Sequence, residues 1–246
     1  MNPTKVGLLA ACTTCLALAG SLAASVWAAR YFYQERSALR LKPVDPAHFE
    51  QQNKALMPSG RRLVIFGDSR AQQLALGPNS AFGWQVINRG VSGESSVQSS
   101  YRFPSDVLAL QPQATVIVTG INDLVAAANL PSHEREAVTN LKVNLTRFAK
   151  DASSLGGIVV VSTIVRPTSP RLIRRPFWSD RVFVLVDEVN EHIRAMTSQS
   201  IRVLDADHIL SGRNKTLPHQ QAIDEIHFSQ HAIDQIEQAL TELLGP

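Results

Sequence analysis

Short apolar runs alternate with longer amphipathic segments from residue 61 onwards, and this alternation constrains the fold more than any other feature of the sequence. The runs are nearly continuous and rich in β-branched residues, as strands buried on both faces of a sheet must be. They cover residues 63–66, 86–87, 115–118, 158–161 and 201–204. Strands that alternate with helices favour a parallel sheet covered by helices on both sides.

Helical periodicity predicts four helices, at residues 105–110, 132–155, 180–198 and 229–244. Ser132 is the predicted N-cap of the second, because Glu134 and Glu136 follow in its first turn. Residues 61–246 have the length of one domain rather than two. Neither a GxGxxG motif after the first strand nor a GxxxxGK[ST] motif occurs, so the dinucleotide-binding and P-loop classes lack their signatures.

Residues 6–29 form an uncharged, mostly apolar run that is long enough to cross a bilayer as a helix. We expect residues 1–35 to be a transmembrane anchor, because Trp27 and Tyr31 lie where a membrane interface would follow the run. The alternative is a secretory signal cleaved after Ala28, which would release the protein. Residues 36–60 are polar and contain three prolines, which predicts a linker.

The charges around the apolar run give two opposite indications of its orientation. Four basic residues follow the run, and the positive-inside rule alone would keep the domain in the cytoplasm. Lys5 precedes the run, however, and a short tail with a lysine is how secretory signals begin. We therefore expect inner-membrane anchoring with the domain in the periplasm.

Charge and cysteine content exclude several classes of function. The net charge is +3, but residues 1–42 hold five basic residues against one acidic residue, which leaves −1 for the rest. A near-neutral domain has no electrostatic reason to bind nucleic acid. Cys12 and Cys15 both lie in the apolar run, so the domain has no disulfide scaffold, cysteine nucleophile or cysteine-ligated zinc.

Polar segments follow the predicted strands, at the sheet edge where open α/β folds bind ligands. Ser69 follows the first strand and offers a hydroxyl at the turn into a helix. Gly93 follows the second and offers an unshielded backbone N–H, and Asn122 follows the third and offers an amide. Before the last helix, His227 offers a base near neutral pH, and Asp224 lies three residues earlier to orient it. These are the groups that acyl transfer needs.

The four segments resemble, in order, the sequence blocks of the SGNH hydrolases, also called GDSL-type esterases and lipases. Ser69 matches the serine of the Gly-Asp-Ser block, and Gly93 matches the glycine of the second block. Asn122 matches the asparagine of the Gly-x-Asn-Asp block, and Asp224 and His227 match the Asp-x-x-His block. The resemblance extends from about residue 63 to the C-terminus.

This resemblance implies a flavodoxin-like three-layer α/β/α sandwich with a central parallel sheet. It implies that Ser69 attacks an ester carbonyl, that His227 moves the proton, and that Asp224 orients the histidine. It further implies that the backbone N–H groups of Ser69 and Gly93 and the side chain of Asn122 form the oxyanion hole. It requires neither a metal nor an organic cofactor.

Three points around the predicted site stay open in the sequence. The family's usual Gly-Asp-Ser-Leu is Gly-Asp-Ser-Arg here, and Arg70 would put a cation beside the nucleophile and bias the substrate. Gly90 competes with Gly93 for the oxyanion role. Asp205 and Asp207 are rivals of Asp224 for the acid.

Residues 166–181 hold five arginines against one acidic residue and follow the fourth predicted strand. The segment should therefore lie near the site, where Arg174 and Arg175 could bind an anionic glycan or a phospholipid headgroup. The alternative interpretation is a solvated basic loop.

The sequence thus predicts a serine esterase that acts on O-acetyl or other short acyl esters of a cell-envelope glycan or lipid. One alternative is an envelope polysaccharide O-acetyltransferase, because an alcohol can replace water in resolving the same acyl-enzyme. The other alternative is a catalytically idle, membrane-tethered assembly component.

Overall fold

A single parallel sheet forms the centre of the domain. The computed structural model describes residues 3–39, 49–54, 56, 60–76 and 83–245. In this part of the chain five strands pair in the order β2-β1-β3-β4-β5, the flavodoxin-like order of doubly wound sheets. They are β1 (Arg61–Gly67), β2 (Trp84–Gly90), β3 (Ala114–Val118), β4 (Ile158–Ser162) and β5 (Ile201–Leu204). Each contains one of the predicted apolar runs, and the predicted fold class is confirmed.

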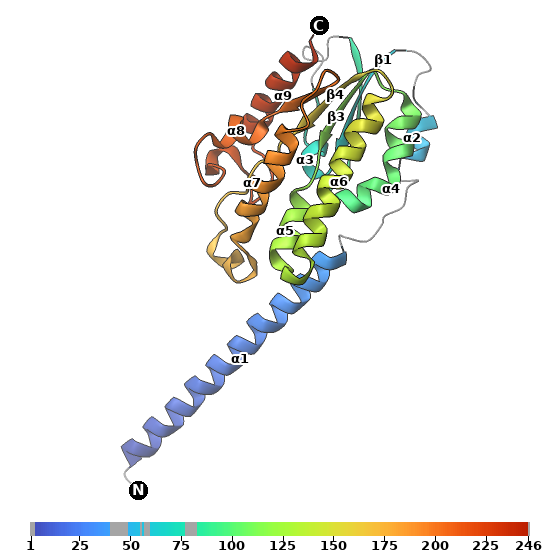
Figure 1. Cartoon of the computed structure of the whole chain (residues 1–246). Coiled ribbons are helices and arrows are strands. Elements are labelled where there is room, and N and C mark those ends of the chain that lie inside the picture. The colour runs from blue at the N-terminus through green and yellow to red at the C-terminus, as the bar shows by residue number, and fades with distance from the viewer. Residues whose placement is uncertain (1–2, 40–48, 55, 57–59, 77–82, 246) are drawn as a thin grey trace.

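Helices cover both faces of this sheet and complete a three-layer sandwich (Figure 1). One face packs against α4 (Ser96–Asp106), α5 (Ile121–Asn129), α6 (Glu134–Ser153) and α7 (Arg181–Arg194). The other packs against α3 (Ser69–Gln72), α8 (Ala206–Ser211) and α9 (Gln230–Leu244). Short 3₁₀ helices connect them: η1 (Leu108–Leu110), η2 (Pro131–His133), η3 (Leu172–Phe177) and η4 (His219–Gln221). A five-residue helix, α2 (Glu50–Lys54), lies beside α4 (Figure 1).

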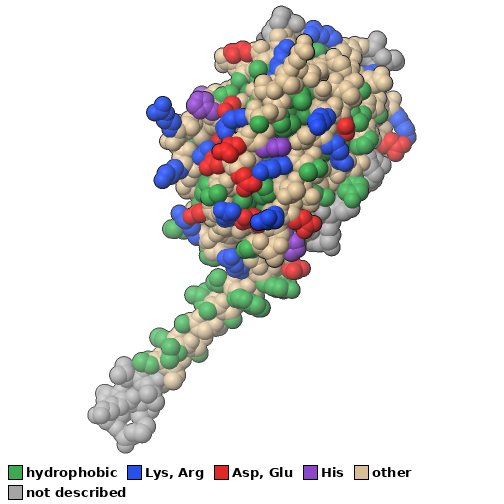
Figure 2. Space-filling view, viewed as in Figure 1, with side chains coloured by type: hydrophobic (Ala, Val, Ile, Leu, Met, Phe, Trp, Pro, Cys, Tyr) green, Lys and Arg blue, Asp and Glu red, His purple; other side chains and the backbone are tan. Residues whose placement is uncertain are grey.

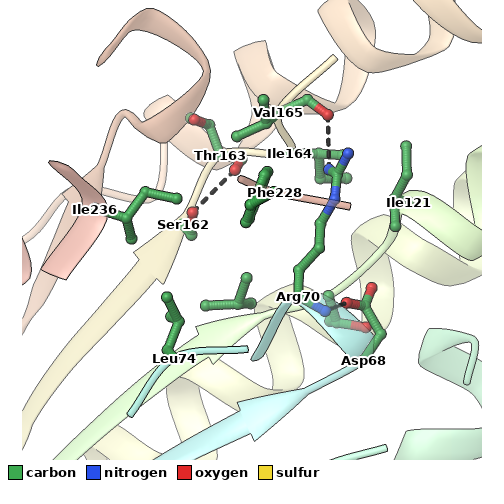
Figure 3. Close-up of a pocket in the computed structure, with 12 residues that line it drawn as sticks. Asp68, Arg70, Leu74, Ile121, Ser162, Thr163, Ile164, Val165, Phe228 and Ile236 are labelled. Atoms are coloured by element: carbon green, nitrogen blue, oxygen red, sulfur yellow. Dashed lines mark hydrogen bonds between the residues drawn. The ribbon is translucent and has the colours of Figure 1, made fainter. Parts of the chain in front are cut away.

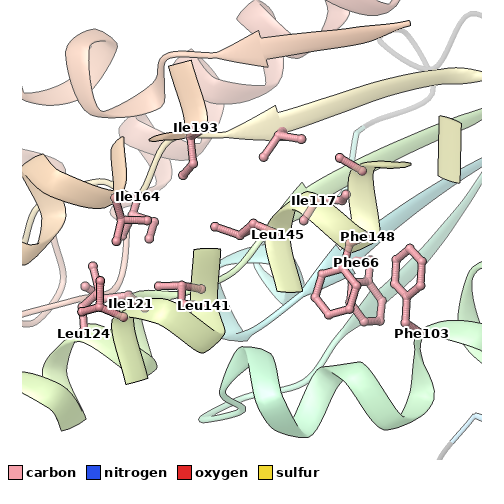
Figure 4. Close-up of a cluster of buried hydrophobic side chains, with 14 of the residues drawn as sticks. Phe66, Phe103, Ile117, Ile121, Leu124, Leu141, Leu145, Phe148, Ile164 and Ile193 are labelled. Atoms are coloured by element: carbon pink, nitrogen blue, oxygen red, sulfur yellow. The ribbon is translucent and has the colours of Figure 1, made fainter. Parts of the chain in front are cut away.

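The alternation of side chains along β1 divides the core into two clusters. Val64 and Phe66 point into the cluster under α4–α7, whereas Leu63 and Ile65 point into the cluster under α8 and α9. In the first cluster three aromatic rings pack together, with the Phe103 and Phe148 centroids 4.5 Å apart and those of Phe66 and Phe103 5.0 Å apart (Figure 4). This packing fixes the strand whose end bears Ser69.

The N-terminal helix α1 (Pro3–Leu39) projects from the domain as a long exposed rod (Figure 1). Its stretch Ala10–Ala38 is long and apolar enough to cross a membrane, a test that a signal sequence also passes. Only its last turns touch the domain. Arg30 NH1 donates to the Pro176 carbonyl at 3.3 Å, and Gln34 Nε2 donates to the Asn129 carbonyl at 2.9 Å. The helix therefore leaves the domain between η3 and the end of α5.

Three of the predicted helices have different boundaries in the structure. The helix expected at residues 105–110 begins nine residues earlier, because a capping box between Ser95 and Gln98 starts α4. The predicted N-cap Ser132 is wrong by one residue: His133 precedes α6, and the Ser132 hydroxyl bonds to the His133 ring. The predicted helix 180–198 ends at Arg194, and the one at 229–244 is confirmed, with Ser229 as its N-cap.

The linker expected at residues 36–60 is only partly described. Residues 36–39 continue α1, and residues 50–54 form α2. The remainder of that prediction, including Pro43, Pro46 and Pro58, lies outside the described residues.

Candidate active site

The carboxyl ends of the parallel strands β1 and β3 lie at one edge of the sheet, and Gly67 lets their backbones approach closely there. A Cβ atom at Gly67 would lie 1.8 Å from the Val118 carbonyl oxygen, and the φ of +148° is one that side chains disfavour. The Asp68 N–H then donates to the same carbonyl at 3.2 Å. This contact brings Ser69, which opens α3, to the same edge as Asn122 in the first turn of α5.

Ser69, His227 and Asp224 form a continuous hydrogen-bonded chain at this edge. The His227 Nε2 atom lies 2.9 Å from the Ser69 hydroxyl oxygen, and its Nδ1 atom lies 2.7 Å from the Asp224 Oδ2 atom. Ser69 is contributed by the start of α3, and the other two by the loop before α9. The structure thus brings together three residues that the sequence separates by up to 158 positions.

Asp224 is held rigidly in place. Its Oδ1 atom accepts hydrogen bonds from the backbone N–H groups of Ile226 and His227, both at 2.8 Å, which leaves Oδ2 for the imidazole. Burial acts to raise the pKa of Asp224, but these hydrogen bonds outweigh it and keep the pKa below its usual value. The carboxylate is therefore ionised at neutral pH and fixes which imidazole nitrogen carries the proton.

The two rival acids bind other partners. Asp205 pairs with Arg194 at 2.9 Å and accepts from the Thr163 hydroxyl at 3.1 Å. Asp207 pairs with Arg166 at 2.7 Å. Both bind side chains near β4, away from the Ser69–His227 pair. Asp224 alone of the three acids contacts the His227 ring in the described part of the chain.

Asn122 and the loop around Gly93 lie together beside Ser69's strand. The Asn122 Nδ2 atom donates to the Glu94 carbonyl at 3.0 Å, which joins α5 to that loop. Gly93 has a φ of +77°, and no heavy atom lies within 4 Å of a Cβ built on it, so the loop is open there. Gly90 differs: its N–H donates to the Asn88 side chain at 2.8 Å, and its Cα packs against the Gln72 backbone. The N–H of Gly90 is therefore occupied, and Gly93 stays the predicted oxyanion donor of the two glycines.

A buried ionic cluster holds the Gly93 loop from below, and the sequence analysis missed it. Arg102 is fully buried and donates to Glu94 at 2.9 Å, to Asp106 at 3.1 Å and to the Gly67 carbonyl at 3.0 Å. The guanidinium therefore ties the loop to the end of β1. In the sequence, Glu94 directly after Gly93 was the one sign of this cluster. A charged side chain that is buried beside a site almost always has a charged or polar partner.

Two buried carboxyl groups, Asp68 and Asp123, fasten the strand ends. Asp68 accepts from the N–H groups of Arg70 at 2.9 Å and Gly120 at 3.2 Å, and burial raises its pKa to about 6. Asp123 accepts from the Ser96 N–H and hydroxyl at 2.9 and 2.7 Å, and burial raises its pKa to about 7. They connect β1 to α5 and α5 to α4, next to Ser69 and Asn122. Neither was predicted as a site residue.

From the sequence we expected Arg70 to place a cation beside the nucleophile. In the structure its side chain does not extend into solvent there. The side chain is 2% exposed and turns inward, where NH1 donates to the Val165 carbonyl at 2.6 Å and Nε to the Ile226 carbonyl at 2.8 Å (Figure 3). Its guanidinium also lies over the Phe228 ring at 4.8 Å. It lines a cavity of about 10 Å³, which is room for about one water molecule. Arg70 therefore braces the loop that holds His227.

The basic segment 166–181 lies at the site edge, but its arginines differ in their surroundings. Arg166 is bound to Asp207. Arg171 and Arg174 reach Glu225, the residue after Asp224, at 3.1 and 3.7 Å. Arg175 approaches Asp180 at 3.8 Å. Arg174 and Arg175 stay half-exposed at the site edge, where a ligand can reach them.

Solved structures similar to this chain have the same fold. A GDSL-like lipase from Bacteroides thetaiotaomicron is 22% identical, with 81% of this chain and 97% of that chain covered and a TM-score of 0.63. A lipase/acylhydrolase from Enterococcus faecalis is 24% identical, with 74% and 94% covered and a TM-score of 0.55. A catalytic mutant of an acetylxylan esterase from Geobacillus stearothermophilus is 17% identical, with 77% and 96% covered and a TM-score of 0.53.

No curated protein matches the chain significantly. The sequence model of the GDSL-like lipase/acylhydrolase family does match, over residues 64–232, which is more than half of the chain. The matched range begins in β1 and ends in α9, so it includes Ser69, Asn122 and His227. The chain therefore belongs to the GDSL-like lipase/acylhydrolase family, the SGNH hydrolases, and is an ester hydrolase of that type.

Proposed function

We propose that the chain hydrolyses carboxylic esters through an acyl-enzyme on Ser69, and that its substrates are acetyl or other short acyl esters of a cell-envelope glycan or lipid. The observation that carries the mechanism is the hydrogen-bonded chain from Ser69 through His227 to Asp224. Family membership supplies the reaction class, and this chain of contacts supplies a nucleophile, a base and an orienting acid.

In the first half-reaction the Ser69 oxygen bonds to the ester carbonyl carbon while its proton passes to His227 Nε2. Asp224 stabilises the imidazolium that results. The charge on the carbonyl oxygen is held by the N–H groups of Ser69 and Gly93 and by the Asn122 amide. The tetrahedral intermediate then breaks its bond to the alcohol oxygen, which takes the proton from Nε2 and leaves. Ser69 remains acylated.

In the second half-reaction a water molecule repeats the sequence. His227 takes one proton from the water as its oxygen attacks the acyl carbon. The bond to Ser69 breaks, the Ser69 oxygen recovers the proton from Nε2, and the carboxylic acid leaves. No step requires a group from outside the chain other than ester and water.

A short acyl group is supported by one of the similar solved structures, a catalytic mutant of an acetylxylan esterase from Geobacillus stearothermophilus. The cavity of about 80 Å³ beside Asp224 does not set the acyl length, because neither Ser69 nor His227 lines it.

The test is hydrolysis of p-nitrophenyl acetate, butyrate and octanoate by the full chain in detergent. We expect kcat/KM to fall as the acyl chain lengthens, as the proposed specificity for short acyl esters requires. A fluorophosphonate, which reacts with activated serines, should label Ser69, as read by mass spectrometry of the digested protein.

Other outcomes of the hydrolysis and labelling experiments would favour a different function or a different acyl length. Labelling of Ser69 without hydrolysis of any ester would favour the acetyltransferase, which needs its own acceptor. Neither labelling nor hydrolysis from a folded protein would favour the idle assembly component. Preference for octanoate would overturn the short-acyl assignment while leaving the esterase in place.

We further propose that residues 1–35 anchor the protein in the inner membrane, that residues 36–60 link the anchor to the hydrolase domain at 61–246, and that the domain lies in the periplasm. The long exposed helix α1 supports the anchor. An alkaline phosphatase fused after residue 60 should be active, because that enzyme needs the periplasm to form its disulfides. An inactive fusion, with a green fluorescent protein fusion at the same position bright, would reverse the orientation.

A further inference from the structure

The segment at residues 171–177, which we call the η3 lip, carries exposed aliphatic side chains at the active-site edge. Leu172 and Ile173 are 89% and 81% exposed, among the most exposed large hydrophobic residues of the domain. Arg171, Arg174 and Arg175 flank them. An aliphatic tip surrounded by arginines is unfavourable in water and is the composition of surfaces that enter the interface of anionic membranes.

Contacts with α1 fix the height of the η3 lip relative to a membrane. Residues 6–29 are uncharged, and at 1.5 Å per residue they extend about 36 Å, enough for a hydrocarbon core of about 30 Å. Arg30 is the first charged residue after them, and it donates to the carbonyl of Pro176 in the η3 lip. Tyr33, less than one turn later, packs against Phe177 with ring centroids 6.0 Å apart. The η3 lip is therefore level with the end of the apolar run.

The aromatic residues of α1 indicate the same plane. Trp27 and Tyr31 stack on each other, with ring centroids 5.9 Å apart. Trp27 lies three residues before Arg30, and Tyr31 directly follows it. Such residues mark the headgroup region of a bilayer. Figure 2 shows α1 below the domain with hydrophobic and uncharged side chains and no acidic or basic group until it reaches the domain, in the part that the structure describes.

The η3 lip is joined to the candidate site through one residue. Glu225 is buried, accepts from Arg171 at 3.1 Å and lies beside Asp224 in the chain. The carboxyl ends of the strands, η3 and the exit of α1 all lie on the same side of the domain (Figure 1). The edge that holds Ser69 and His227 therefore faces the membrane side.

We propose that the η3 lip is a membrane-contact surface: Leu172 and Ile173 enter the headgroup region of the bilayer that α1 spans, and the arginines bind anionic headgroups. The active-site edge then opens onto esters presented at that membrane surface. This inference rests on the proposed anchoring by α1 and is independent of whether Ser69 turns over ester.

The test is the depth of a fluorescent label on the full chain in lipid nanodiscs. In a Cys12→Ser/Cys15→Ser background, an environment-sensitive dye is attached to Ile173→Cys, and doxyl lipids at the headgroup depth act as quencher. We expect a blue shift and strong quenching at Ile173 in phosphatidylglycerol nanodiscs, both reduced in phosphatidylcholine. Adding Arg174→Gln and Arg175→Gln should remove the difference between the two lipids, because it removes the charges that attract the anionic one.

Two control positions separate the possible failures. Leu155→Cys puts the same dye on an exposed aliphatic position at the opposite end of the sheet, where no quenching is expected. Ala17→Cys puts it near the middle of the apolar run of α1, where quenching is expected from lipids that carry the doxyl group deep in the acyl chain. Quenching at Ala17 with none at Ile173 would overturn the η3 lip alone, whereas none at Ala17 would overturn the anchor and the η3 lip with it. A blue shift at Ile173 that follows protein concentration without lipid quenching would assign the surface to a second copy of the chain.

Discussion

Replacing Ser69 by alanine should lower kcat for p-nitrophenyl acetate on the order of 10⁶-fold, and His227→Ala should cost about as much. The reason is that the serine oxygen is a weak nucleophile unless the imidazole 2.9 Å away takes its proton. The double variant should be no slower than either single variant, because each substitution alone already disables the pair. Single-turnover kinetics on purified full chain measure all three.

Smaller and graded losses are expected around this pair. Asp224→Asn should cost about 10⁴-fold, because the imidazole loses the partner of its Nδ1 proton. Asn122→Ala should cost about 10²–10³-fold, as the loss of one oxyanion donor. Asp205→Asn is the matched control for the acid, and Asn129→Ala, a buried asparagine of the same helix, is the control for the amide. A loss at Asp205 equal to that at Asp224 would contradict the assignment.

Replacing Arg102 by methionine should lower the free energy of unfolding by about 3–5 kcal/mol, the usual cost of removing one partner of a buried ion pair. The side chain of Arg102 is fully buried with Glu94 and Asp106, so its loss removes the ion-pair partner of two buried carboxylates. Urea denaturation followed by tryptophan fluorescence measures the change.

The matched control is Arg194→Met, which breaks an ion pair with Asp205 that is 43% and 36% exposed. Exposed pairs contribute about 0–1 kcal/mol, so this variant should change stability little. Adding Glu94→Gln and Asp106→Asn to Arg102→Met should recover part of the loss, since no unpaired charge then stays buried. Equal losses of unfolding free energy for Arg102→Met and Arg194→Met would show that the buried ion pairs of Arg102 stabilise the fold no more than the exposed pair of Arg194.

The sheet and the position of the candidate site could be predicted because both leave local patterns. A strand buried on both faces has to be apolar throughout, as residues 63–66 and 158–161 are. In a parallel sheet all carboxyl ends meet at one edge, so Ser69 and Asn122 could be expected there although they are 53 positions apart.

The residues that hold the site in place leave no such pattern. Arg70 and Arg102 look like solvated cations, and only tertiary contacts reveal that one binds carbonyl groups of Val165 and Ile226 while the other binds Glu94. The start of α4 was missed for the same reason, because its buried face contains Arg102 and Asp106 where an amphipathic helix would have apolar residues. A buried polar group needs a hydrogen-bond partner, and that partner can lie far away in the sequence. The local sequence therefore does not identify it.

The hydrogen bond between His227 and Ser69 joins residues 158 positions apart, and this separation determines when the enzyme becomes active during its own synthesis. The ribosome adds Ser69 to the chain 158 residues before His227, so the nucleophile exists without its base during that stretch of synthesis. Contacts between residues so far apart in the sequence are slow to form, because a long loop has to be closed first. A nascent chain therefore has an inert serine, and esters in the compartment of synthesis do not react with it, until His227 has been made and has reached Ser69.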